Sequence, residues 1–185
     1  MGLFPARRPR PRAGHGRGFQ RRAAGRLRHG DGPHPRQTQG RPVSEIIHAS
    51  GAPLPVGRYP HARRVGNLLF LSGIGPRTPG TNEIPGNVYN AAGRLVDYDI
   101  VTQCHSVFAN VRAVLEASHC RWDWLVDVTV YLTDMQSDFH AYNGVWAEYF
   151  PDVNKAPCRT TLGITALPTP IAIELKCVAA FPESR

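Results

Sequence analysis

Two segments show the hydrophobic spacing of amphipathic helices. Between Asp99 and Ala117 apolar residues recur at intervals of three and four, the period of one helix face, at Val101, Cys104, Phe108, Val111 and Leu115. The opposite face of this predicted helix carries Gln103, Asn110 and Arg112. A second helix is predicted from about Ser137 to Phe150, and it buries Phe139, Tyr142, Trp146 and either Tyr149 or Phe150.

Four other stretches show strand patterns. Residues 62–72 predict two short strands that turn at Gly66-Asn67, and residues 125–132 are rich in β-branched types. Further strands are predicted near 160–164 and over 171–180, the latter with Ala172, Glu174 and Lys176 on one face and apolar residues on the other. A loop rich in Gly and Pro is predicted from residue 73 to about residue 93.

The order of these elements indicates an α+β domain. Strands, helix, strand, helix and strands predict a mixed or antiparallel sheet with both helices on one face. The other face then has no cover within the chain and is either solvated or buried by another subunit. Its mixture of Ala, Glu and Lys with apolar neighbours suits a subunit interface lined with functional polar groups.

Charge divides the 185 residues into two parts. Residues 1–42 hold 11 of the 22 Lys and Arg residues and one of the 14 acidic residues, so 43–185 carry 11 − 13 = −2 of the net charge of +8. The domain itself therefore does not match the basic character of a nucleic-acid-binding protein. We predict that 1–42, rich in Arg, Gly and Pro and without a hydrophobic period, is a disordered extension and that 43–185 form one domain.

Three interpretations of residues 1–42 stay open. They are an RNA-binding arm, an Arg-rich organelle transit peptide, and a translation start placed upstream of the natural one. The lack of Ser and the many Pro argue against a transit peptide, and the domain pattern begins abruptly at Val43. The sequence contains no run of about 18 apolar residues and no apolar secretory segment, so we expect a soluble, cytoplasmic protein with no membrane partner.

Several kinds of site are not indicated. The four cysteines form no CxxC pair and the histidines are scattered, so we expect free, buried thiols and no metal site. Ser72 lies in FLSGIG rather than in the GxSxG motif of serine hydrolases. The glycines at 73, 75, 80 and 86 lack the spacing of a phosphate-binding loop.

Two charged residues are the best candidates for chemistry. Glu174 lies inside the apolar strand IAIELKCV, where a carboxylate is unfavourable unless it is paired or used. The alternative for Glu174 is an ion pair with Lys176 or exposure to solvent. Arg159 lies in the run PCRTT, where a guanidinium fork can hold a carboxylate in two parallel hydrogen bonds. Its alternative is an ordinary cation at a strand edge.

Together these segments resemble the Rid superfamily of enamine/imine deaminases over essentially all of 43–185. The matching stretches are PVGRY (55–59), FLSG (70–73), DF with YN (138–143), PCRTT (157–161), LP (167–168) and IEL (173–175). Their order and spacing are more specific than any single stretch. Within the superfamily, the run GRYPHARRVGNLLFLSG is most similar to bacterial 2-aminomuconate deaminases.

The resemblance implies a chorismate-mutase-like fold, a homotrimer or a hexamer of paired trimers, and active sites in clefts between subunits, without a metal or organic cofactor. Arg159 is then the clamp for a substrate carboxylate, and Glu174 positions and activates water. The predicted substrate-binding residues are Tyr59, Ser72, Asn143, Thr161 and Arg58. Thr161 stands where many relatives have Cys, so a thiol mechanism is not expected.

Three functions follow as hypotheses. The first is hydrolysis of 2-aminomuconate to 4-oxalocrotonate and ammonia in aromatic catabolism, for which Arg58, Arg63, Arg64 or Arg77 is a candidate second carboxylate anchor. The second is a general deaminase of 2-aminoacrylate-type imines. The third is a non-catalytic RNA- or ligand-binding protein that uses the basic extension.

Overall fold

Six strands form one mixed sheet in the computed structural model, which describes residues 44–81 and 83–183. The order across the sheet is β1 (Ser44–Ile47), β2 (Ala62–Val65), β3 (Leu68–Leu71), β8 (Ile173–Ala180), β6 (Leu125–Leu132) and β7 (Cys158–Gly163). Strands β6 and β7 run parallel, and the other neighbours run antiparallel. The predicted disorder of 1–42 lies outside the described residues.

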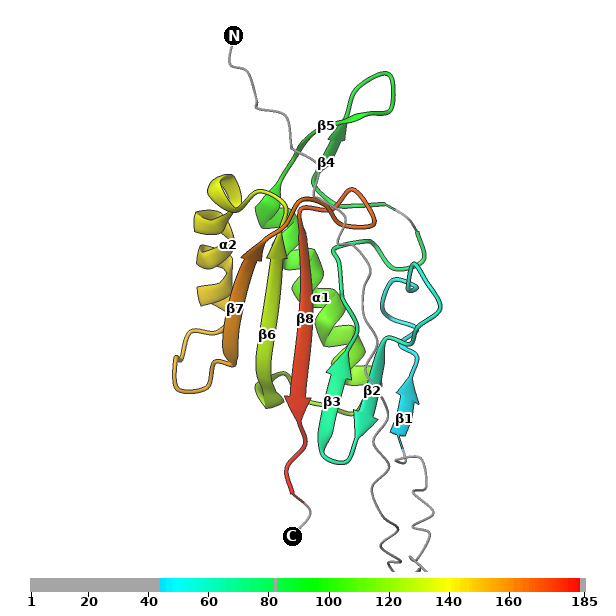
Figure 1. Ribbon diagram of the computed structural model, residues 1–185, viewed down its shortest axis with the longest axis vertical. Coiled ribbons are helices and arrows are strands. Elements are labelled where there is room, and N and C mark those ends of the chain that lie inside the picture. Colours follow the sequence, from blue (N-terminus) through cyan, green and yellow to red (C-terminus); the bar gives the residue numbers. More distant parts are fainter. Residues whose placement is uncertain (1–43, 82, 184–185) are drawn as a thin grey trace, which may run out of the picture. The chain divides into compact units, whose positions relative to one another are not determined.

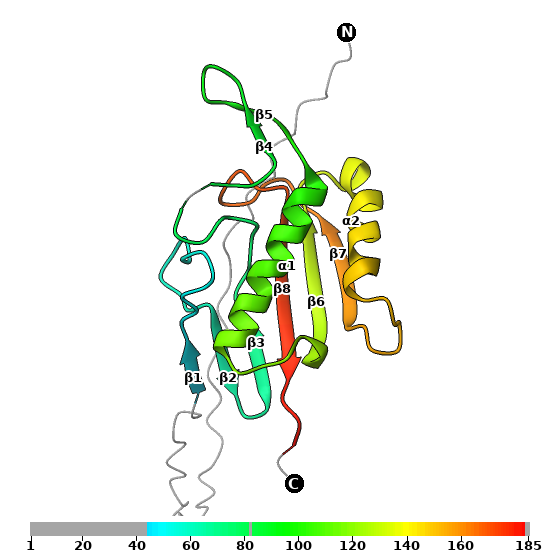
Figure 2. The ribbon, with the colours of Figure 1, turned by 180° about the vertical axis from the view of Figure 1, so that it is seen from behind.

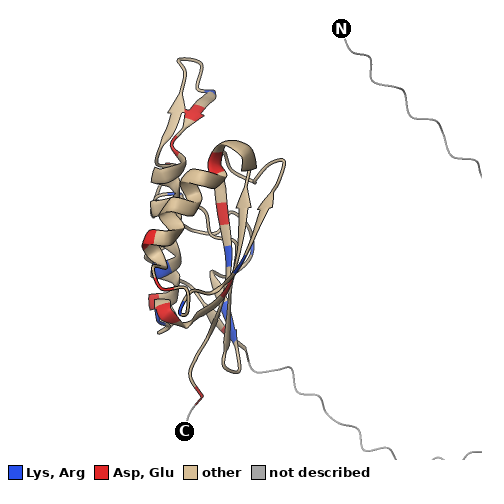
Figure 3. Cartoon of the chain, turned by 90° about the vertical axis from the view of Figure 1, so that its left-hand side faces the viewer, with Lys and Arg blue, Asp and Glu red and all other residues tan. Residues whose placement is uncertain are grey.

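Both helices pack on the same face of this sheet. Helix α1 (Ile100–Ala117) crosses β8 and β3, and α2 (Met135–Tyr149) lies over the β6 and β7 side (Figures 1 and 2). The short 3-10 helix η1 (Trp122–Trp124) leads into β6. Figure 3 shows the two layers edge-on, and within the described part of the chain no element covers the second sheet face. The predicted α+β class with both helices on one face is confirmed.

An aspartate begins each helix. The Asp99 carboxylate accepts hydrogen bonds from the backbone N–H groups of Val101 (2.9 Å) and Thr102 (3.3 Å), two donors that have no partner inside the helix. Asp134 caps α2 in the same way, with Ser137 among its donors (3.0 Å). Helix α2 therefore begins two residues before the predicted position, because its N-cap precedes the apolar stripe.

The exposed face predicted for α1 is partly wrong. Gln103 and Asn110 are buried, whereas Val101 is 38% exposed although it was predicted to be a core residue. On α2, Phe139 was also predicted to be a core residue and is 41% exposed. Loops pack over that side of α1 and use its polar side chains as hydrogen-bond partners: Asn110 Nδ2 donates to the carbonyl of Gly75 at 2.8 Å. The spacing of hydrophobic residues cannot predict that loops cover this side of α1, because a side-chain amide can be buried when it is hydrogen-bonded, and its residue type is polar.

The predicted loop at 73–93 contains a strand that its composition did not reveal, β4 (Asn87–Tyr89). It pairs with β5 (Leu95–Tyr98), which follows the predicted loop, in a separate hairpin that projects beyond the sheet (Figure 1). The Tyr98 hydroxyl donates to the buried Asp138 carboxylate at 2.9 Å and so ties the base of the hairpin to α2. Strand β1 was also not predicted, because four residues carry too little periodicity.

The four cysteines are free, as expected. Cys104, Cys120 and Cys177 are buried as predicted, but Cys158 is exposed on the edge strand β7, so the prediction of burial is wrong for that residue. Neither α1 nor α2, the helices of the described ranges, has the length and apolar content that crossing a membrane requires.

Gln103 supports a stability prediction. Its fully buried amide donates to Asn87 Oδ1 and accepts from the backbone N–H of Ala172, both at 2.8 Å. In Gln103→Leu these partners lose their bonds, so we expect the free energy of unfolding to fall by about 2–4 kcal/mol in urea titrations. Gln136→Leu, on an exposed position of α2, should change stability little. Equal stability of the two variants would contradict the prediction.

Candidate active site

Glu174 lies on the sheet face that the helices leave open. Its neighbours Ile173 and Leu175 are buried toward the helices, so the alternation of β8 turns Glu174 the other way. The carboxylate is half-buried, and this burial raises the pKa of the Glu174 carboxyl. A glutamate with a raised pKa in a cleft is suited to proton transfer near neutral pH.

Glu174 is not neutralised by its neighbour on the same face. Lys176 Nζ instead donates to the carbonyl of Leu71 at 3.4 Å. Within 44–81 and 83–183 the ion pairs are Arg121 with Asp123 and Lys155 with Asp152. The alternative in which Glu174 and Lys176 form a structural ion pair is therefore wrong.

The backbone after β3 makes room for this carboxylate. Ile74 and Leu175 exchange two N–H···O=C hydrogen bonds of 2.9 Å, which place Gly73 directly against Glu174. A Cβ atom on Gly73 would lie 2.8 Å from Glu174 Cδ and overlap the carboxylate oxygens. A side chain at position 73 would therefore displace the Glu174 carboxylate, and glycine lets the carboxylate keep this position.

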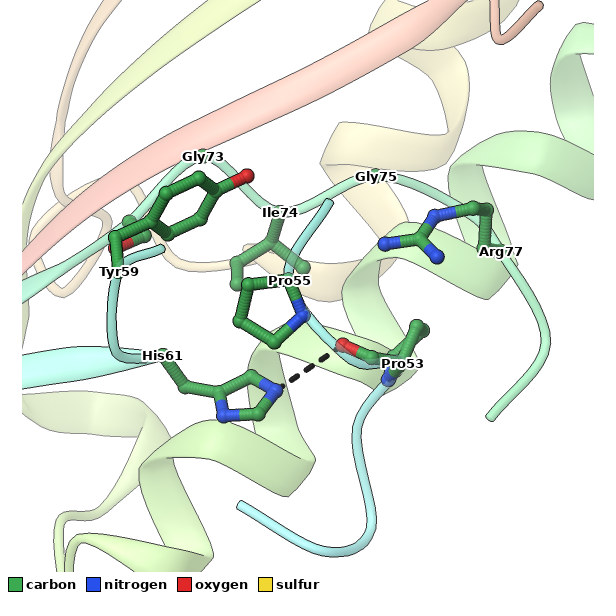
Figure 4. Close-up of a pocket in the computed structure, with 9 residues that line it drawn as sticks. Pro53, Pro55, Tyr59, His61, Gly73, Ile74, Gly75 and Arg77 are labelled. Carbon is green, nitrogen blue, oxygen red and sulfur yellow. Dashed lines mark hydrogen bonds between the residues drawn. The ribbon is translucent and has the colours of Figure 1, made fainter. Parts of the chain in front are cut away.

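A cleft adjoins Glu174. Its lining comes from three segments that are far apart in sequence: Val56, Tyr59, Gly73, Gly75, Arg77, Pro168, Thr169, Ile171 and Glu174. A second hollow continues from it and shares Tyr59, Gly73, Gly75 and Arg77 (Figure 4). In Figure 4 the Tyr59 ring and the Arg77 side chain reach into this hollow from opposite ends.

Hydrogen bonds hold the wall of this hollow in place. Ser72 Oγ donates to the carbonyl of Pro60 at 2.7 Å. His61 is buried, its Nδ1 accepts from the backbone N–H of Ala49 at 3.1 Å, and its Nε2 donates to the carbonyl of Pro53 at 3.0 Å (Figure 4). Both His61 nitrogens are thus used in structural bonds, and the ring serves to position the loop that carries Tyr59.

Arg159 points to the opposite, helix-covered side. Its guanidinium lies 4.8 Å from the centre of the Trp146 ring and 5.5 Å from that of Tyr142, both on α2. Arg159 Nη1 and the Tyr142 hydroxyl are buried without a hydrogen-bond partner in the described structure. An arginine held by aromatic rings with an unused donor is suited to binding an anion.

Arg159 and Glu174 do not converge within one chain. In the sheet Arg159 aligns with Val128 and Glu174 aligns with Tyr131 of the same strand β6. The offset of three residues along the strands and two strands across them corresponds to a Cα separation of about 14 Å. Because the two side chains also leave opposite faces of the sheet, one small substrate cannot contact both in a single subunit.

The other predicted site residues lie at different positions relative to Glu174 and Arg159. Tyr59 and Ser72 line the hollows near Glu174. Thr161 lies two residues after Arg159 on the same face of β7, and Asn143 is exposed on α2. Arg58 is exposed and is not part of the lining of these hollows.

Three contributors were not indicated by sequence reasoning as site residues. Gly73 makes space for a carboxylate, His61 fixes a loop, and Tyr142 contacts Arg159. The stretch FLSG already included Gly73, but only the bridge between Ile74 and Leu175 shows that it lies against the Glu174 carboxylate. Tyr142 was assigned to the core, and it is fully buried there, with a pKa that burial raises to about 12.

Comparison with known proteins shows the family of this chain. The family described as endoribonuclease L-PSP matches residues 49–181. A RutC family protein of Pyrococcus horikoshii is 36% identical over 137 residues, which are 74% of this chain and 98% of the relative. The chloroplastic Reactive Intermediate Deaminase A of Arabidopsis thaliana is 32% identical over 74% of this chain and 66% of its own length.

A solved structure has a similar fold. The crystal structure of E. coli TdcF with bound serine superimposes with a TM-score of 0.63 at 27% identity and covers 75% of this chain and 99% of that chain. The chain belongs to the endoribonuclease L-PSP family, that is, to the Rid superfamily that its sequence resembles. The particular similarity to 2-aminomuconate deaminases stays a prediction.

The raised pKa of Glu174 leads to a test by pH. The folded chain binds this proton more tightly than the unfolded chain, so stability falls as the pH rises above about 4.3, the ordinary glutamate value, through the raised pKa. Glu174→Gln removes the buried charge, and its stability relative to wild type should therefore increase from pH 4 to pH 7, as measured by urea unfolding. Glu148→Gln, at an exposed position of α2, is the control. A difference independent of pH would contradict the prediction.

Proposed function

We propose that this protein hydrolyses an enamine or imine that carries a carboxylate and releases ammonia. The observation that carries the proposal is the pair of unneutralised charges, Glu174 in a cleft and Arg159 on an aromatic support, in a chain related to a protein named Reactive Intermediate Deaminase A. A carboxylate clamp and a proton-transfer group are the two parts that this reaction needs.

The chemistry needs only these groups and water. The enamine tautomerises to an imine next to its carboxylate, and water adds to the imine carbon to form a carbinolamine. Glu174 takes a proton from the attacking water and passes it to the nitrogen, which gives a carbinolamine with a hydroxyl and an NH2 group. It then carries the hydroxyl proton to the same nitrogen, so the C–N bond breaks, ammonia leaves and the oxygen becomes the carbonyl oxygen of a ketone. Arg159 holds the carboxylate so that the imine carbon stays at the attacking water.

We further propose that the site forms between two copies of this chain in a homotrimer. Arg159 lies at the edge strand β7 and Glu174 on the open face, so the edge of one subunit placed on the open face of the next would bring them together. Exposed apolar residues on that face support an interface, with Phe70 39% and Leu162 43% exposed.

The substrate that we propose is 2-aminomuconate, which yields 4-oxalocrotonate and ammonia. The run GRYPHARRVGNLLFLSG supports it by resemblance, and the cation Arg77 beside Glu174 supports it by charge. The alternative substrate is 2-aminoacrylate, an enamine with a single carboxylate, for which a second cation would have no role.

The test of the deaminase proposal is ammonia release from enzymatically generated 2-aminomuconate and 2-aminoacrylate. We expect Arg159→Ala to lower kcat/KM about 10- to 100-fold through loss of charged hydrogen bonds, and Glu174→Gln to lower kcat about 10²- to 10⁴-fold. The exposed residues Arg94 and Glu148 provide matched controls in Arg94→Ala and Glu148→Gln. A wild-type protein that accelerates neither reaction would refute the proposal.

Mixing the two inactive variants tests the shared site. If Arg159 and Glu174 come from different subunits, unfolding and refolding Arg159→Ala together with Glu174→Gln should restore about one quarter of wild-type activity, because one interface in four joins the two intact residues. Each variant refolded alone is the control. If activity does not return although the mixed species form, both residues of a site come from one chain, and the shared site is wrong.

RNA is the second candidate substrate because the family is described as an endoribonuclease. The net charge of −2 over 43–185 argues against it, whereas the 11 arginines of 1–42 would bind a polyanion. A chain that begins at residue 43 distinguishes the two functions. Loss of RNA binding with full ammonia release would assign RNA to the basic extension, and RNA cleavage by the shortened chain would replace the deaminase proposal.

A further inference from the structure

Arg77 is a second cation at the cleft of Glu174. It follows β3 in the loop that continues from Gly73, and it lines both hollows together with Tyr59 (Figure 4). The residue is only partly exposed. A guanidinium at this place adds positive charge to a cleft in which Glu174 supplies the negative charge.

The main chain that carries Arg77 is held rigidly on α1. Asn110, which is buried, donates through Nδ2 to the carbonyls of Gly75 and of Arg77 itself, both at 2.8 Å. Ser106 Oγ donates to the carbonyl of Pro76 at 2.7 Å. These three bonds fix consecutive carbonyls, so the loop presents Arg77 in one position, and little entropy is lost when a ligand binds.

The side chain is oriented but not neutralised. Arg77 Nη2 donates to the carbonyl of Leu54 at 2.6 Å, which uses one of the five N–H donors of the guanidinium. Neither of the two ion pairs in the described ranges includes Arg77. A positioned guanidinium with donors to spare, next to a cleft, is the arrangement that recognises a carboxylate.

The other candidate cations are used or placed elsewhere. Arg64 stacks over Phe181 at 3.9 Å and donates to the carbonyl of Gly66 at 3.1 Å. Arg63 lies on β2, and Arg58 is exposed, and neither lines the cleft of Glu174. Of the four arginines that the sequence offers as a second anchor, Arg77 is the one in this cleft.

We infer that Arg77 binds a second carboxylate and makes the site selective for enamines or imines of dicarboxylic acids. The inference rests on the proposed function, because the first carboxylate is assigned to Arg159 and the reacting carbon to the neighbourhood of Glu174. The second carboxylate then extends along the cleft to Arg77, past Tyr59. A substrate with one carboxylate gains nothing from this residue.

Arg77→Met, which keeps the length of the side chain but not its charge, tests the selectivity. We expect kcat/KM for 2-aminomuconate to fall about 10- to 100-fold, mainly through KM, and kcat/KM for 2-aminoacrylate to change less than about 2-fold. Arg77→Lys should recover part of the loss, because it restores the charge but not the planar fork. Arg94→Met, in the exposed turn of the β4–β5 hairpin, is the matched control. Equal losses on both substrates, or no loss, would overturn the inference.

Binding of stable compounds separates this inference from the proposed reaction. Muconate and sorbate share a six-carbon diene skeleton and differ in the second carboxylate. Calorimetry should show that wild type binds muconate at least about 10-fold more tightly than sorbate and that Arg77→Met removes the difference. If ammonia release fails while this preference is present, the deaminase proposal is wrong and the dicarboxylate site stands. If wild type binds both compounds equally, the dicarboxylate site is wrong whatever the reaction.

Discussion

The pairing of β8 with both β3 and β6 is the interaction on which the rest of the structure depends. This last strand of the chain lies between β3 and β6, two strands that come earlier in the sequence, and its backbone hydrogen bonds join them into one sheet. Its alternation buries Ile173, Leu175 and Cys177 under the helices and turns Glu174 to the open face. The two additional bonds between Leu175 and Ile74 extend this pairing beyond β3 and bring Gly73 to the carboxylate.

The two charged candidates, Arg159 and Glu174, lie on different faces of this sheet. Arg159 lies at the edge strand and is supported by the rings of Tyr142 and Trp146, so its charge is kept close to the core without an ion partner. Glu174 is kept half-buried on the other face. A half-buried charge without an ion partner is unfavourable, and a fold that retains two of them has reason to use both in binding. The separation of the two groups is what makes a shared site between copies of the chain the simplest proposal.

Polar residues of α1 hold segments next to the cleft in place. Gln103 joins the β4–β5 hairpin to the segment before β8, and Asn110 with Ser106 fixes the loop of Arg77. These side chains replace the water that the loop carbonyls would otherwise bind, and they do so in a rigid geometry. Helix α1 therefore packs its apolar side chains into the core and uses Ser106 and Asn110 to fix the loop that lines the cleft.

The amino-acid sequence by itself determined the two helices, the paired strands at 62–71, the strand at 125–132, the α+β class and the candidates Arg159 and Glu174, because periodicity and an acid in an apolar strand are local signals. The tertiary structure alone decided which face each charge occupies, that Gly73 lies against the Glu174 carboxylate, and that Gln103 and Asn110 are buried. It also singled out Arg77 among four arginines. These outcomes depend on strand register and on loops that return to the helix from distant positions, and neither leaves a periodic trace in the sequence.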